Sequence, residues 1–126
     1  MKKIEAYIRH DTFDAIRDAL DHAGLPSMSV VEVKGSGRQK GYTERYRGAR
    51  MTVYLRPKLK LEIAVADEDL DTALDIILAH AQTGEIGDGK ILVSDLAEAI
   101  RVRTGERGEN VLARESGDQT PSLRIR

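Results

Sequence analysis

The first part of the chain alternates hydrophobic and polar residues and then changes to a helical spacing. Residues 2–8 (KKIEAYI) alternate, which is the pattern of a half-buried strand. The following apolar residues recur three and four positions apart until Gly24, and Asp11 or Thr12 can cap this segment. Residues 29–35 (SVVEVKG) are rich in β-branched side chains and predict a second strand that ends in a glycine turn. The expected order is strand, helix, strand.

The same order returns in the second half of the chain. After Pro57, the segment KLKLEIAVA alternates aliphatic and polar residues and predicts a third strand. Asp67 or Asp69 heads a second amphipathic segment whose apolar positions continue to Ala81. Residues 90–96 (KILVSDL) predict a fourth strand. Two βαβ units in succession indicate the α+β class and a ferredoxin-like βαββαβ fold, with an antiparallel four-stranded sheet covered by two helices on one face.

This arrangement leaves one face of the sheet uncovered. Aromatic content is only 4%, and small aliphatic residues fill the predicted strands. We therefore expect the open face to pack against other copies of the chain in a closed oligomer. Residues 104–126 lose the periodicity and gain glycine, serine and charge, so we expect most of this segment to be poorly ordered.

Composition narrows the class of protein. A chain of 126 residues with 40% hydrophobic content suits one compact domain. Its 20 basic and 21 acidic side chains nearly cancel, which argues against a globally basic nucleic-acid-binding protein. The absence of cysteine excludes disulfides, thiolate zinc sites and cysteine nucleophiles. Since the chain has no signal-peptide core and no long apolar run, we expect a cytoplasmic protein.

The charge is uneven, however. Residues 35–58 carry seven Lys or Arg side chains against one acid, Glu44. A connection of this length in a compact domain is usually functional or disordered. Nucleic-acid binding by this basic loop is the alternative function, although the sheet lacks the aromatic pairs that stack bases in RNA-binding versions of this topology.

Two further segments could bind anions. Residues 83–90 (TGEIGDGK) place three glycines around one aspartate between a helix and a strand, where backbone amides can cradle a phosphate. The spacing does not match a Walker motif, and a tight turn with a solvated lysine is the alternative interpretation. Arg101 and Arg103 alternate, so both guanidinium groups would lie on one face of an extended segment, suited to a triphosphate or to a solvated strand edge.

Nothing in the sequence assembles a catalytic site. The three histidines, His10, His22 and His80, lie far apart, and no Ser-His-Asp set can be built. Asp88 or Lys40 could orient water, so we expect at most slow ATP hydrolysis. Near Lys40, the amide oxygen of Gln39 could complete a magnesium shell supplied with phosphate oxygens. A non-enzymatic binding protein is the natural interpretation.

Four motifs in order, EVKGSGRQKGYTERYRGA, PKLKLEI, TGEIGDGKI and RVRTGE, resemble the PII signal-transduction family, which reports nitrogen and energy status. The resemblance covers residues 1–107, leaving 108–126 as a C-terminal tail. It implies a homotrimer that binds ATP or ADP in the clefts between subunits, with Arg101 and Arg103 reaching across from the adjoining subunit. The nucleotide-binding residues that it implies are Ser29, Gly35, Gly37, Gln39, Glu62, Ala64, Gly87, Asp88, Gly89, Lys90, Arg101 and Arg103.

The resemblance also implies a site for 2-oxoglutarate that forms with Mg-ATP and not with ADP. In this site Gln39 would ligate Mg²⁺, Lys58 would pair with the keto acid, and Lys40 and Gly41 would lie beside it. Ser36 stands where the family usually has phenylalanine, which removes an apolar contact at this site.

The basic stretch would then contain the T-loop, residues 38–56, an effector arm that docks on partners. The resemblance implies an ammonium channel, another membrane transporter or a nitrogen-metabolism enzyme as partner, so that any membrane association would be through that partner. The partner-binding residues would be Arg45, Tyr46, Arg47 and Arg50. Met51 occupies the position of the tyrosine that is uridylylated in many relatives, so no modification is expected there.

Overall fold

The computed structural model describes residues 1–35, 42–46, 49–53 and 56–114. Its strands are β1 (Lys2–Ile8), β2 (Met28–Gly35), β3 (Tyr42–Tyr46), β4 (Ala49–Val53), β5 (Arg56–Val65) and β6 (Lys90–Asp95). Its α-helices are α1 (Phe13–His22) and α2 (Leu70–Ala81), and its 3₁₀ helices are η1 (His10–Thr12), η2 (Asp67–Asp69) and η3 (Glu109–Leu112).

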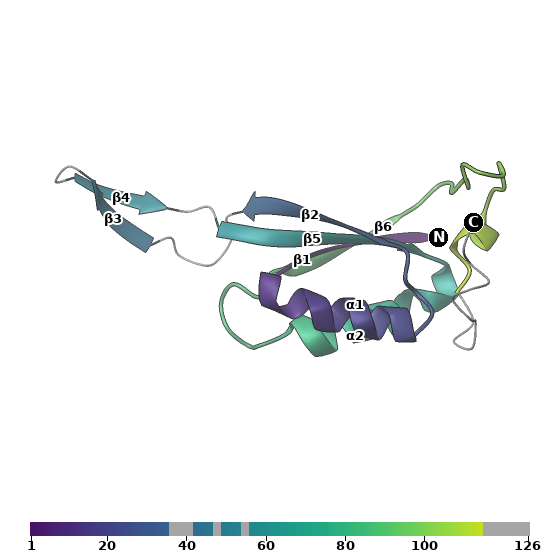
Figure 1. Cartoon of the computed structure of the whole chain (residues 1–126), viewed down its shortest axis with the longest axis horizontal. Helices are drawn as coiled ribbons and strands as arrows, with labels where there is room; N and C mark the ends of the chain where they lie inside the picture. Colours follow the sequence, from purple (N-terminus) through teal and green to yellow (C-terminus); the bar gives the residue numbers. More distant parts are fainter. Residues whose placement is uncertain (36–41, 47–48, 54–55, 115–126) are drawn as a thin grey trace.

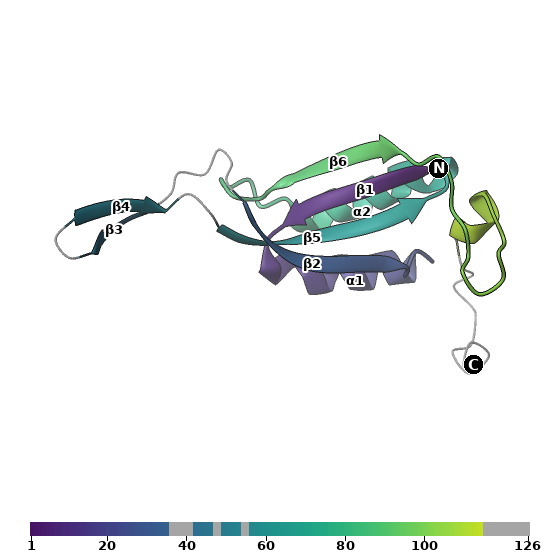
Figure 2. The same ribbon diagram turned by 90° about the horizontal axis from the view of Figure 1, so that it is seen from above.

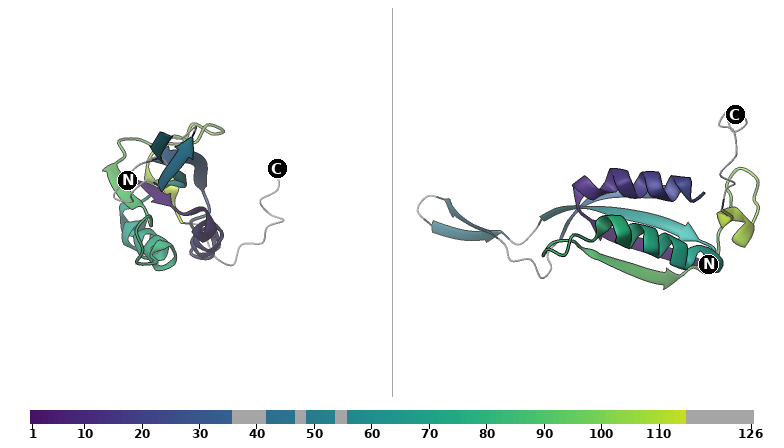
Figure 3. Two further views of the ribbon diagram at one scale, coloured as in Figure 1. Left: turned by 90° about the vertical axis from the view of Figure 1, so that its left-hand side faces the viewer. Right: turned by 90° about the horizontal axis from the view of Figure 1, so that it is seen from below.

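The main sheet is antiparallel, with strand order β2-β5-β1-β6. Both helices pack on the same face of it, as the end-on and lower views show (Figure 3). The predicted ferredoxin-like α+β fold is therefore confirmed. Helix α1 ends at His22 because Gly24 adopts a φ of 82°, which glycine tolerates and other residues rarely adopt.

The hydrophobic core lies between the sheet and the two helices. Alternate residues of β1 and β5 point into it, and the helices contribute residues spaced three or four apart. Ile4, Ile16, Leu61 and Ile77 are fully buried. The predicted helix caps lie at the expected positions, but neither Thr12 nor Asp69 makes a side-chain capping bond.

The open face matches the prediction of small aliphatic residues only in part: Val31 of β2 and Leu92 of β6 are exposed on it, but its two central strands carry charge. Figure 2 shows this face with the helices behind it. Across β1 and β5 it carries a network of ion pairs: Lys3 contacts Glu62 at 3.2 Å, and Lys60 contacts both Glu62 and Glu5 at 3.5 Å. Alternation correctly identified which residues point away from the core, but the outward positions of these two central strands are mostly charged.

The basic stretch contains a hairpin that is separate from the main sheet. Strands β3 and β4 pair antiparallel with Arg45 opposite Arg50, and in Figure 1 they lie beyond the ends of β2 and β5. Residues 36–41, 47–48 and 54–55 lie outside the described residues.

The segment after β6 folds back on itself. We call residues 96–108 the hook, because a bridge between Ile100 and Arg107 joins its two limbs. The hook is followed by η3, so residues 104–114 contain more local structure than their composition predicts. Residues 115–126 lie outside the described residues, and the expectation of a poorly ordered tail stays a prediction there.

Candidate functional site

The glycine-rich segment 83–90 connects α2 to β6 and folds around the carboxylate of Asp88. We call residues 83–90 the phosphate loop, after the prediction that they bind phosphate. Asp88 Oδ2 accepts hydrogen bonds from the backbone N–H groups of Thr83 and Gly84, both at 2.8 Å. Asp88 Oδ1 accepts from the Thr83 hydroxyl and from Arg9 Nε, the latter at 3.1 Å. The aspartate therefore organises the loop from within.

These hydrogen bonds stabilise the ionised form of Asp88. The Thr83 hydroxyl is the largest cause, and the backbone N–H groups of Thr83 and Gly84 and the Arg9 guanidinium add to it against the cost of burial. Together they hold the pKa of Asp88 well below its usual range. Because both oxygens of Asp88 already accept hydrogen bonds, this carboxylate stabilises the conformation of the loop. Direct contact between it and an anionic phosphate would be repulsive.

Glycine is required at the end of the loop. Gly87 and Gly89 have φ values of 102° and 101°. A Cβ built at Gly89 would lie 1.7 Å from the backbone carbonyl oxygen of Tyr7. This close approach lets the loop run directly into the pairing of β6 with β1, in which Lys90 lies opposite Tyr7. The glycines that predicted an anion cradle are thus also needed for the packing of the loop on the sheet.

Two cationic side chains contact the phosphate loop, and a third, Lys90, is its last residue. Arg9 donates through Nη2 to the carbonyl oxygen of Ile86 at 2.9 Å, in addition to its bond with Asp88. The Lys58 ammonium group donates to the Gly87 carbonyl oxygen. Lys90 Nζ lies 5.8 Å from the centroid of the Tyr7 ring, within cation–π range. Because Arg9 already pairs with the Asp88 carboxylate, it is the Lys90 ammonium group at the end of the loop that adds positive charge and favours an anionic ligand.

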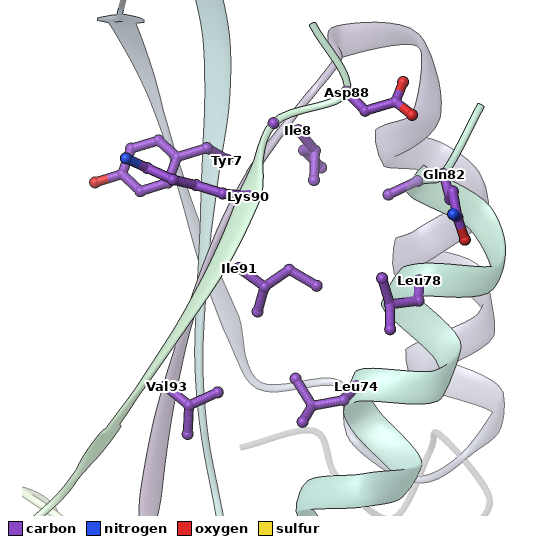
Figure 4. A pocket seen from close by; sticks show the side chains of 11 residues that line it. Tyr7, Ile8, Leu74, Leu78, Gln82, Asp88, Lys90, Ile91 and Val93 are labelled. Carbon is purple, nitrogen blue, oxygen red and sulfur yellow. The ribbon is translucent and has the colours of Figure 1, made fainter. Parts of the chain in front are cut away.

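An apolar groove of about 530 Å³ lies beside the loop, between α2 and β6 (Figure 4). Leu74, Leu78, Ile91 and Val93 point into it, and Asp88 lies at its end near the loop. The side chains of Tyr7 and Lys90 point together to the other side of the sheet (Figure 4). Leu78 of α2 is 48% exposed, and Val93 of β6, which lies across the groove, is 44% exposed. The apolar stripe predicted for α2 is therefore only partly covered within one chain.

A second group of predicted residues lies on the open face. Ser29 of β2 stands opposite Glu62 of β5, and Ala64 follows two positions along the same strand. The Glu62 carboxylate contacts Lys3 and Lys60, and the hydrogen bond from Lys3 is the largest cause of a pKa of Glu62 below its ordinary value. Ser29, Glu62 and Ala64, three of the predicted nucleotide-binding residues, therefore lie close together.

The predicted arginine pair has a different local structure from the one expected. Arg101 and Arg103 lie in a turn of the hook, not in an extended segment. Arg101 donates to Glu106 at 2.6 Å, and the Gly105 N–H donates to the Arg101 carbonyl oxygen at 2.7 Å, which closes the turn. Alternation predicted a strand here, but the glycine at 105, with a φ of 74°, allows the chain to reverse instead.

The predicted ligand-binding residues fall into two groups at opposite ends of the sheet. Gly35, Lys58 and the phosphate loop lie at the end near the β3–β4 hairpin, whereas the hook lies at the other end, beyond β6 (Figures 1 and 2). At a rise of about 3.4 Å per residue, Lys58 and Ala64 of β5 are separated by about 20 Å. One chain therefore does not bring the two groups together.

Several predicted residues lie outside the described residues. They are Gly37, Gln39, Lys40, Gly41 and Arg47. Arg45, Tyr46, Arg50 and Met51 belong to the hairpin strands. Among the residues that the structure does describe, no group of three or more His, Asp or Glu side chains could hold a metal ion. No helix in the described ranges is long and apolar enough to cross a membrane.

Three residues of the site were missed by sequence reasoning. Arg9 and Thr83 bind Asp88, and Tyr7 packs against Lys90 and the phosphate loop. Thr83 is five residues from Asp88, so a side-chain-to-backbone turn could have been predicted locally. Arg9 is separated from Asp88 by 79 residues, and no local pattern marks it.

Comparison with known proteins identifies the family of this chain. Residues 1–106 match the family model described as "Nitrogen regulatory protein P-II". The chain is 51% identical over 112 residues to the nitrogen regulatory protein P-II of Rhodobacter capsulatus, which covers 89% of this chain and 100% of the relative. It is 54% identical over 109 residues to nitrogen regulatory protein P-II of Klebsiella oxytoca and to nitrogen regulatory protein P-II 1 of Escherichia coli (strain K12), covering 86% of this chain and 97% of each relative. The chain belongs to the P-II family of nitrogen regulatory proteins.

Proposed function

We propose that this P-II protein is a homotrimer that binds ATP or ADP in the clefts between its subunits and regulates a partner through residues 38–56. P-II proteins are regulators of nitrogen metabolism and not enzymes. The observation that supports nucleotide binding is the phosphate loop, in which Asp88 is held by Arg9 and by donors of the loop itself, with the Lys58 ammonium group on the Gly87 carbonyl oxygen and Lys90 at the end of the loop. This combination suits a polyphosphate.

The separation of the two residue groups supports a site between subunits. Gly87, Asp88, Gly89 and Lys90 would contribute the phosphate end from one subunit. The group at the other end of the sheet, which includes Arg101 and Arg103 in the hook, would come from the neighbouring subunit. The exposed groove between α2 and β6, which lies beside the loop, is apolar surface that a neighbouring copy would cover.

The sequence also supports a 2-oxoglutarate response. Lys58 contacts the phosphate loop directly through Gly87, so an acid that pairs with Lys58 would act on the loop itself. Mg²⁺ bound with ATP would be a hard cation, suited to the carboxylate and keto oxygens of 2-oxoglutarate and to the phosphate oxygens of ATP. Gln39, Lys40 and Gly41 are the residues proposed to complete this site, and competition for the Lys58 ammonium group would link the ligand to the loop.

For the partner, we propose a membrane protein such as an ammonium channel or another transporter, or a nitrogen-metabolism enzyme. The β3–β4 hairpin lies away from the main sheet, as a docking arm requires (Figure 1). Arg45 and Arg50 of the hairpin strands, together with Arg47 in the sequence between them, favour an acidic partner surface. Because Met51 has no hydroxyl group, it cannot be uridylylated, and we expect no covalent control at this position. We propose that the protein acts in the cytoplasm.

Calorimetric titration of the purified full chain with ATP and with ADP tests the proposal, together with light scattering for the trimer. We expect one nucleotide per subunit at sub-millimolar concentration. Lys90→Gln should weaken binding, whereas Arg17→Gln, a change on the exposed side of α1, should leave it unchanged. A wild-type chain that binds neither nucleotide, or that is monomeric, would refute the proposal.

A second titration separates the two ligand functions. 2-Oxoglutarate should bind in the presence of Mg-ATP and not in the presence of ADP, and Lys58→Ala should abolish this binding. Gln39→Ala should abolish it while ADP binding survives. If the wild-type chain binds nucleotide but never 2-oxoglutarate, the protein senses adenine nucleotides alone.

A further inference from the structure

A buried aspartate at the start of α2 is tied to the C-terminal segment. Asp69 is 4% exposed and occupies the N-cap position of α2, but its side chain makes no capping bond. Instead, Asp69 Oδ1 accepts two hydrogen bonds from the Arg114 guanidinium group, from Nε at 3.1 Å and from Nη2 at 2.7 Å. An acid in a capping position is thus used for a contact with a residue 45 positions later.

Asp69 needs the ion pair more than Arg114 does. Within the described part of the chain, the second oxygen of Asp69, Oδ2, is buried and has no hydrogen-bond partner. The Arg114 side chain is 42% exposed and remains partly in water. A buried carboxylate is costly unless a cation compensates it, whereas a half-exposed guanidinium group tolerates the loss of its partner. The burial of Asp69 therefore favours the conformation in which Arg114 is docked.

Arg114 lies directly after the hook and η3. The hook begins where Leu96 donates to the carbonyl oxygen of Met1 at 3.0 Å. Its limbs are joined by backbone bonds from Arg101 N to the Glu106 oxygen (2.8 Å) and from Gly108 N to the Ala99 oxygen (3.0 Å). Its outgoing limb is held by β6, which is part of the sheet. The returning limb reaches the folded domain again at Arg114.

We propose that the Asp69–Arg114 pair is a latch that positions the hook, so that Arg101 and Arg103 are presented to the phosphate loop of a neighbouring subunit. Arg114 and Asp69 are positioning residues, because neither belongs to the proposed ligand site. The role in nucleotide binding rests on the proposed function, but the hold on the hook does not. Arg114 lies beyond residues 1–106, which the family model matches, so the latch is a feature of this chain that the family match does not supply.

The test compares variants that release the latch in different ways. Arg114→Gln leaves the buried carboxylate unpaired and can destabilise the whole domain. Asp69→Leu removes that carboxylate and keeps an apolar side chain in a buried position, so it releases Arg114 without an unpaired buried charge. Arg114→Lys keeps the charge but loses the planar two-donor contact. Arg17→Gln is the matched control, since it removes exposed ion pairs on α1.

Amide hydrogen exchange of the trimer and calorimetry with ADP are the two readouts. In Asp69→Leu, exchange of residues 99–111 should be about tenfold faster while β1 and β5 exchange as in the wild type, because the hook then opens locally. The ADP dissociation constant should rise about three- to tenfold, a loss typical of a charge-assisted contact that is no longer held in place. Arg114→Lys should lie between wild type and Asp69→Leu in both readouts.

The outcomes separate the latch from the proposed function. Unchanged exchange of residues 99–111 in a folded Asp69→Leu protein overturns the latch. Faster exchange with unchanged ADP affinity overturns its role in presenting the arginines. A wild-type chain that binds no ADP refutes the proposed function, and the exchange measurement still decides whether Asp69 and Arg114 hold the hook.

Discussion

Arg9 and Asp88 are joined by an ion pair of 3.1 Å between Nε and Oδ1, although 79 residues separate them. The same guanidinium group also donates to the carbonyl oxygen of Ile86 at 2.9 Å. One side chain at the end of β1 thus holds both the carboxylate and the backbone of the phosphate loop. This double contact requires the planar, multi-donor geometry of arginine.

Replacement of Arg9 by lysine tests this contact. Lysine keeps the positive charge but cannot easily reach both acceptors from one fixed plane. If the loop binds nucleotide as proposed, Arg9→Lys should weaken ADP binding about three- to tenfold by calorimetry, with little change in the denaturation midpoint. Arg17→Lys on α1 is the control. Equal affinities of Arg9→Lys and wild type would show that charge alone, and not the double contact, is required.

A methyl group at Gly89 should be poorly tolerated. The Cβ of Gly89→Ala would lie 1.7 Å from the Tyr7 carbonyl oxygen, at a φ of +101°, so either the loop or β1 must move. We expect a loss of about 3 kcal/mol or more in the free energy of unfolding, measured with urea.

Gly84→Ala provides the comparison for this prediction. Gly84 has a similar positive φ of +87°, but no described atom lies within 4 Å of its Cβ position. The cost there should be the backbone term alone, about 1–2 kcal/mol. If both variants lose the same stability, the close approach to Tyr7 contributes nothing beyond the backbone conformation.

Acid should loosen the phosphate loop. Because the pKa of Asp88 is lowered in the folded chain, its ionised form stabilises the native state at neutral pH. This contribution is complete above the unfolded pKa of about 3.9 and is lost as pH falls below it, through the folded value. Amide exchange of Thr83 and Gly84, corrected for the intrinsic rate, should therefore lose protection only below about pH 4.

Asp88→Asn is the control for the acid effect. Its side chain has nearly the same shape but no titratable proton, so the loop should be weakened at neutral pH and show no further change in acid. Protection of Thr83 and Gly84 that falls equally in the variant and in the wild type would assign the acid effect to other carboxylates.

If the loop binds nucleotide as proposed, the Tyr7 ring should contribute to this binding through Lys90. Their separation of 5.8 Å places the Lys90 ammonium group within cation–π range of the ring. Tyr7→Leu removes the ring and should weaken ADP binding about two- to fivefold, as expected for a partly exposed pair. Tyr7→Phe keeps the ring and should bind like the wild type. A loss in the phenylalanine variant would instead identify the hydroxyl group as the contact.

Some elements could be predicted closely from local pattern. The bounds of the first strand, residues 2–8, match β1, and the second strand differs from β2 only in its first residue. Both helices begin directly after a predicted capping residue, Thr12 for α1 and Asp69 for α2. Alternation and helical spacing are local consequences of the need to bury one side of each element, so they are visible in the sequence.

The hook shows where local pattern was insufficient. Arg101 and Arg103 alternate like strand residues, and no motif marks Asp69 and Arg114 as partners. The turn depends on bonds between the two limbs, including the Arg101–Glu106 pair at 2.6 Å. Such contacts become favourable only when the rest of the fold brings the limbs together, so residue-by-residue spacing does not reveal them.

The sequence by itself determined the α+β class, the order of the core elements, the glycine-rich loop and the family resemblance. Each of these features depends on patterns within short segments of the chain. Only the tertiary structure decided that Asp88 is satisfied inside the loop, that Arg9 holds it, and that the predicted nucleotide-binding residues lie at two ends of one sheet. These relationships join residues far apart in the chain, and they arise from the antiparallel register that places β1 between β5 and β6. The same register keeps the two groups of predicted residues apart within one chain, which is the physical reason to expect function between copies.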